Sequence, residues 1–111
     1  MPDRLRFAKY EEDTSPLSDQ ERRKLRRSMI EYGNLCSEEF ALWQKGRIPD
    51  DIWEVWQDGI SENFETAIWR STWAEVSREF ESFEAFMRFM KELLLRAEKA
   101  AAKKVLSVPA H

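Results

Sequence analysis

The sequence has a single cysteine, Cys36, and a single histidine, His111, which is its last residue. One cysteine cannot form a disulfide within the chain, and a zinc site with four cysteine and histidine ligands is excluded. A histidine-based triad, a Cys–His pair and the Glu-x-x-His motifs of a di-iron bundle each need a histidine inside the fold. We expect Cys36 to be a small buried hydrophobe. The sequence predicts no catalytic residue, no metal and no cofactor.

Glycine and proline are scarce as well, with three glycines and four prolines in 111 residues. β-Sandwiches and barrels depend on these residues for their many turns, so both classes are disfavoured. No stretch approaches the roughly 20 apolar residues of a membrane span, and the N-terminal segment lacks the apolar core of a secretory signal. The sequence therefore predicts an all-α fold, a cytoplasmic location and no membrane span.

Two further features that could indicate an enzyme give little support. No G-x-x-x-x-G-K-[ST] loop is present to hold phosphates. Glu54, Asp58 and Glu62 could in principle form a catalytic pair or bind a hard cation, but a spacing of four is typical of a solvated helix face. We therefore expect a protein that is not an enzyme.

Apolar residues at helical spacing are abundant, and they predict a compact bundle of about four helices. The predicted organisation is a flexible arm at 1–17, a single helical domain at 18–106 and a tail at 107–111. The chain is too short, and its linkers are too short, for a second domain.

The first helix is predicted for residues 19–45. Ser18 and Glu21 match a capping box at its start, and Gly46 suits the residue that follows its end. Gly33-Asn34 interrupts the pattern, and the sequence leaves open whether these residues kink or split the helix.

The second helix is predicted to open at 48–51, because proline and aspartate suit a first turn. Thr66 and Ser82 are the predicted caps of a third and a fourth helix. The apolar face predicted for the second helix comprises Ile52, Trp53, Val55, Trp56, Ile60 and Phe64. The stripe predicted for the fourth helix comprises Phe83, Phe86, Met87, Met90, Leu93, Leu94, Ala97 and Ala101.

The apolar stripe of the fourth helix is longer than a short bundle could cover. Phe89 and Leu95 lie beside this stripe, and we expect them to add exposed apolar surface. Residues 22–27 are mostly basic, whereas residues 51–65 carry five acids and no base. Opposite charge blocks of this kind can steer two copies together, and a twofold dimer is the commonest closed assembly. The sequence predicts a homodimer that buries part of the fourth helix, with a monomer as the alternative.

Four of the five tryptophans, Trp53, Trp56, Trp69 and Trp73, fall within 21 positions. Four amphipathic helices in a short chain need large side chains to bury enough area, so these rings are expected to form the core. Two alternatives stay open. The rings could line a pocket for a small apolar or cationic ligand, or they could form part of a protein-binding surface.

The second group of candidate interaction residues is basic and comprises Arg22, Arg23, Lys24, Arg26 and Arg27. A solvated helix start explains them best, and the alternatives are an acidic protein partner, a nucleic acid or an anionic membrane surface. The formal net charge of −3 argues against a dedicated nucleic-acid binder.

The stretch "LWQKGRIPDDIWEVW" at 42–56, the later Trp73 and the run "FESFEAFM" at 80–87 resemble a group of small uncharacterised bacterial all-helical proteins. The resemblance covers residues 30–90 and implies a bacterial or phage setting without an assigned activity. Taken together, we expect a non-enzymatic protein that acts through protein–protein contacts. The alternatives are a nucleic-acid-associated accessory protein that uses the basic segment, and a small-ligand sensor that uses the tryptophan cluster.

Overall fold

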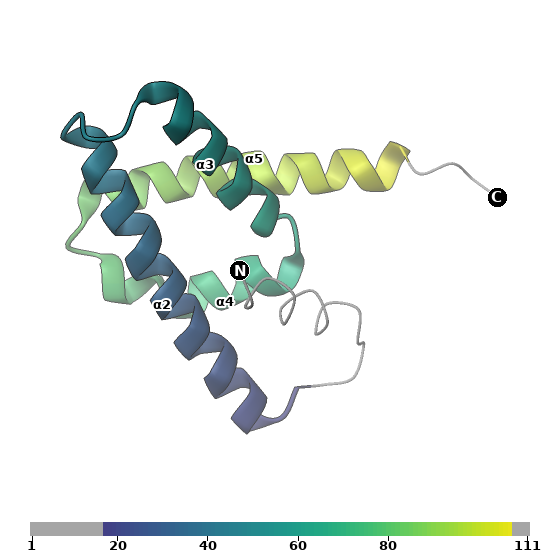
Figure 1. The fold of residues 1–111 in the computed structure, drawn as a ribbon. Helices are drawn as coiled ribbons and strands as arrows, with labels where there is room; N and C mark the ends of the chain where they lie inside the picture. Colours follow the sequence, from purple (N-terminus) through teal and green to yellow (C-terminus); the bar gives the residue numbers. More distant parts are fainter. Residues whose placement is uncertain (1–16, 108–111) are drawn as a thin grey trace.

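A computed structural model describes residues 17–107 of the chain, and these residues contain four α-helices, one 3-10 helix and no strand (Figure 1). The predicted all-α class is therefore confirmed. The predicted arm, apart from Leu17, and the predicted tail, apart from Ser107, lie outside the described residues. The elements in chain order are α2 (Asp19–Gln44), α3 (Asp50–Asn63), α4 (Ala67–Val76), η1 (Ser77–Phe80) and α5 (Glu84–Ser107).

The ends of α2 follow from local hydrogen bonding. The Glu21 N–H donates to Ser18 Oγ at 3.1 Å, and the Ser18 N–H donates to Glu21 Oε1 at 3.0 Å, which confirms the capping box. Past the other end, Gly46 adopts a φ of +74°. Its N–H donates to Trp43 O, and the N–H of Arg47 donates to Leu42 O. This is the Schellman arrangement, which glycine favours because it has no Cβ.

Helix α2 is continuous through Gly33, so this residue does not split it. Glycine is required there for a different reason. A Cβ atom on Gly33 would lie 2.5 Å from Cζ of Phe80 and 2.9 Å from Cζ3 of Trp73. Gly33 therefore lets the aromatic rings of η1 and α4 approach the backbone of α2.

The starts of the later helices agree less closely with the predictions from the sequence. Pro49 precedes α3, and Asp50 and Asp51 form its first turn, as predicted. Thr66 is the residue before α4, but its side chain makes no capping bond. Helix α5 begins at Glu84, so Ser82 lies two residues before the helix and the predicted cap is wrong by one position.

The four helices pack in two pairs, with α2 against α4 and α3 against α5 (Figure 1). Phe40 joins three helices, because its ring centroid lies 6.1 Å from that of Trp53 in α3 and 5.1 Å from that of Phe89 in α5. The largest fully buried side chains are Trp69, Phe64, Phe80, Met29 and Met90. Eight of the seventeen buried hydrophobic residues in the described part of the chain are aromatic, and every helix contributes to this core.

The stripe of α5 is covered by the chain itself as far as Ala97, which is fully buried. Phe89 is half-buried against Phe40 and Trp53, so the prediction that it adds exposed surface is wrong. Phe83 was predicted on the stripe, but it precedes α5 and is 52% exposed. Leu95 is exposed, as predicted. Among the described residues, no helix has the length and apolarity to cross a membrane.

Candidate functional site

Three of the four clustered tryptophans lie in the core. Trp53, Trp69 and Trp73 are each 2–3% exposed, which confirms the core interpretation for these rings. Trp56 is 39% exposed, so the same interpretation is wrong for it. The reason is that the apolar arc of α3 is wider than the part of it that other helices cover, and Ile52 and Val55 are exposed on the same arc.

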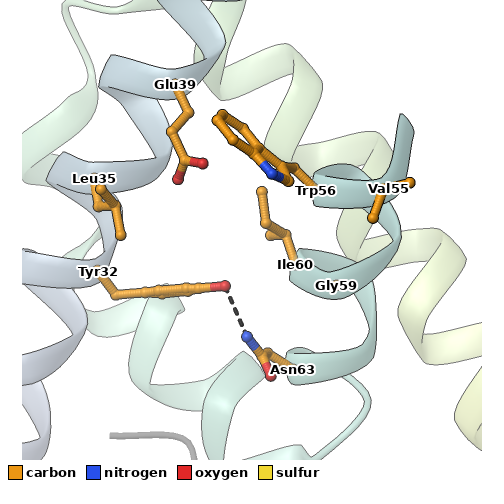
Figure 2. Close-up of a pocket in the computed structure, with 8 residues that line it drawn as sticks. All are labelled: Tyr32, Leu35, Glu39, Val55, Trp56, Gly59, Ile60 and Asn63. Atoms are coloured by element: carbon orange, nitrogen blue, oxygen red, sulfur yellow. Dashed lines mark hydrogen bonds between the residues drawn. The ribbon is translucent and has the colours of Figure 1, made fainter. Parts of the chain in front are cut away.

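Trp56 stands at a groove of about 320 Å³ between α2 and α3 (Figure 2). The indole lies over one side of the groove, and Gly59, one turn further along α3, leaves space beside it. A Cβ atom on Gly59 would meet no atom within 4 Å. The lining residues are Tyr32, Leu35 and Glu39 from α2 and Val55, Trp56, Gly59, Ile60 and Asn63 from α3.

The floor of the groove is a buried polar contact. Asn63 Nδ2 donates to Tyr32 Oη at 2.8 Å and so ties the end of α3 to the middle of α2 (Figure 2). The Tyr32 ring also packs edge-on against Trp69, with centroids 4.9 Å apart. Asn63 Oδ1 is buried without a hydrogen-bond partner among the described residues. The floor is therefore fixed by packing, although one of its polar atoms is unsatisfied.

Burial controls the titratable groups around this floor. Desolvation, followed by the charge of Cys36, raises the pKa of Tyr32 far above its ordinary 10.0. Desolvation and then the charge of Glu39 raise the pKa of the Cys36 thiol to about 12. Both groups are neutral at physiological pH. Because the thiolate is the reactive form of cysteine, Cys36 is an inert buried thiol, as the sequence predicts.

Glu39 is the charged group of the groove. It is half-buried, and its carboxylate points into the space between Leu35 and Trp56 (Figure 2). Desolvation raises the pKa of Glu39 above its usual 4.5. Within residues 17–105, it has neither an ion-pair nor a hydrogen-bond partner.

The groove has exposed apolar side chains on both sides. Leu35 of α2, which lines the groove, is 45% exposed, and Leu42, two turns further along α2, is 38% exposed. Ile52, Val55 and Trp56 of α3 are 43%, 67% and 39% exposed. Most of the exposed large hydrophobic side chains of the described residues therefore lie on these two helices, and three of them, Leu35, Val55 and Trp56, line the candidate site.

The basic candidate residues lie elsewhere, in the first turns of α2. Arg22 Nη1 lies 3.9 Å from Glu75 Oε1 of α4, with both side chains exposed, and Arg26 is half-buried. Successive residues of this segment point to different sides of the helix, because a turn takes 3.6 residues. Because Trp53, Trp69 and Trp73 are buried, the basic segment and the tryptophan cluster do not form one surface.

Sequence reasoning missed several residues of the groove, namely Tyr32 as its floor, Leu35, Glu39 and Asn63. One available signal was the pair Leu35 and Leu42, which are seven positions apart and lie beside the core stripe of α2 rather than on it. Within the described residues, no group of three or more His, Cys, Asp or Glu side chains is placed to hold a metal ion.

Comparisons with protein-family profiles, with curated proteins and with solved structures give no match to this chain. The resemblance to small bacterial helical proteins stays a prediction.

Proposed function

We propose that the protein is non-enzymatic and acts through protein–protein contacts, with the groove between α2 and α3 as the docking surface. The observation that supports this proposal is the apolar rim around Trp56, to which both helices contribute exposed side chains. Folded monomers seldom expose contiguous apolar patches, and such patches are typical of interaction sites. Tryptophan is among the residues that contribute most binding energy at protein interfaces.

The dimensions of the groove favour a helix as the bound segment. Tyr32 and Glu39, which line the groove from α2, lie seven residues apart, which corresponds to about 10 Å along α2 at 1.5 Å per residue. An amphipathic partner helix presents apolar side chains at positions i, i+4 and i+7 over the same length. The space beside Gly59 would accept one of these side chains. The proposal includes the bacterial or phage setting that the sequence resemblance implies and the cytoplasmic location expected from the sequence.

Gly59→Leu provides a direct test, because Gly59 lines the groove and a Cβ atom there would meet no atom within 4 Å, so a larger side chain would occupy the space of the groove. We would select binders to the full chain from a displayed library of helix-forming peptides and then measure their affinity for Gly59→Leu. Gly59→Ala is the matched control, because it removes the same glycine but leaves most of the groove open. We expect peptides that bind the native chain and Gly59→Ala but lose binding to Gly59→Leu.

Circular dichroism melting of both variants would verify the fold, and neither variant should melt below the native chain. Selected peptides that bind Gly59→Leu as tightly as the native chain would contradict the proposal, because the docking surface would then lie elsewhere.

A further inference from the structure

We propose that the segment bound in this groove is basic, and that one of its arginine or lysine side chains pairs with Glu39 between the rings of Trp56 and Tyr32. This inference rests on the proposed function and specifies the chemistry of the partner.

The first argument is the isolation of Glu39. Two acids, one in α3 and one just after it, already have cationic partners on α5, since Asp58 accepts from Arg96 at 2.5 Å and Glu65 pairs with Lys104. Glu39 has no such partner within residues 17–105. A carboxylate that is half-buried among apolar side chains loses hydration without compensation. An incoming cation would supply that compensation.

The second argument is the kind of side chain that surrounds Glu39. The indole of Trp56 lies on one side of the groove, and the ring of Tyr32 lies at its floor (Figure 2). Aromatic faces attract cations, and the attraction increases where water is excluded. Arginine fits such a site better than lysine, because its planar group can stack on a ring and donate two parallel hydrogen bonds to one carboxylate.

The third argument is the charge around the groove. Residues 37–66, which include all of α3 and the adjoining end of α2, contain eight acidic and two basic side chains. An acidic surface of this kind repels acidic segments and increases the association rate of basic ones. The local charge and the unpaired carboxylate therefore favour the same class of partner.

The peptides selected on the native chain also test this inference. We expect groove-dependent peptides to share an arginine or lysine at one fixed position beside an apolar residue. For such a peptide, Glu39→Gln should weaken binding about tenfold, as expected for loss of a hydrogen bond between charged groups. Glu38→Gln is the matched control. It removes the same charge from the neighbouring exposed residue, and it should change Kd by less than about twofold.

A double-mutant cycle would isolate the pairing. Replacing the fixed cation of the peptide by glutamine should weaken binding to the native chain but have little further effect on Glu39→Gln. Groove-dependent peptides without a fixed cation, or an unchanged Kd for Glu39→Gln, would overturn the inference and leave the docking groove in place. The absence of any groove-dependent peptide would overturn both proposals.

Discussion

The ring of Phe80 lies directly against Gly33, in the middle of α2, where a Cβ atom would come within 2.5 Å of Phe80 Cζ. Phe80 is 1% exposed, and its ring stacks on that of Trp73 at 5.3 Å between centroids. The backbone of α2 thus forms part of the wall of the aromatic core. Gly33 marks a close approach between elements and not a break in the helix.

This contact predicts opposite effects for the same substitution at two glycines. Gly33→Ala should destabilise the fold by about 1–3 kcal/mol, because the added methyl group overpacks a full core. Gly59→Ala should stabilise it by about 0.5–1 kcal/mol, because alanine favours the helix and its methyl group meets open space. Urea unfolding of the two variants and the native chain would measure both values. A stabilising Gly33→Ala would contradict the close approach.

Two tryptophans provide a second contrast. Trp73→Ala should destabilise by about 3–5 kcal/mol, because the ring is 3% exposed and its removal leaves a cavity. Trp56→Ala should cost less, about 1–2 kcal/mol, because the ring is 39% exposed at the groove and its removal takes less apolar surface out of burial. Thermal melts followed by circular dichroism would compare the two variants. Equal losses would mean that Trp56 is buried after all.

Alkaline pH should destabilise the protein through Cys36. The thiol has a pKa of about 12 in the folded chain, against 9.0 as its ordinary value. Below pH 9.0, the thiol keeps its proton in both the folded and the unfolded chain, so its ionisation takes nothing away from the free energy of unfolding. Between pH 9.0 and about 12, the unfolded chain loses its proton first, so the free energy of unfolding falls as pH rises.

The urea concentration at the unfolding midpoint should therefore decrease as the pH rises through this window. The decrease should be less steep for Cys36→Ala than for the native chain. Part of the decrease would remain in that variant, because burial also raises the pKa of Tyr32 above 10.0. Thiolate absorbance that appears near pH 9.0 in the folded native chain would show that the thiol is accessible to solvent.

The homodimer predicted from the sequence can be tested by light scattering over a dilution series. If α5 forms the interface, the mass should be about twice 13.3 kDa. Leu95→Glu should then restore the monomer, because Leu95 is exposed in the single chain and a carboxylate there would be buried without a partner. A mass near 13.3 kDa at every concentration would exclude this dimer.

The features that the sequence predicts best are local ones. The capping box of Ser18 and the left-handed Gly46 depend on residues within one or two helical turns, and both are found in the structure. The helical class was predictable for the same reason, because its evidence is the periodic spacing of apolar residues along each segment.

The predictions from the sequence are wrong where tertiary packing determines whether a side chain is buried. Periodicity places Trp56 on an apolar face, but it does not say how much of that face the neighbouring helices cover. Phe89 lies off the main stripe of α5 and is nevertheless covered, because Phe40 of α2 crosses over it. The candidate site depends on such relationships, and Glu39 becomes distinctive only once Trp56 is seen to lie opposite it.

The members of the two helix pairs alternate along the sequence, and this order determines which contacts are lost when the chain is cut. Since α2 packs against α4 and α3 against α5, the partners of each pair are separated by a member of the other pair. A cut in any connection between these helices therefore separates at least one pair. During synthesis, Phe40 and Trp53 lack their ring contacts with Phe86 and Phe89 until α5 has left the ribosome. We therefore expect a nascent chain without α5 to expose aromatic surface, which is the kind of surface that chaperones and proteases act on.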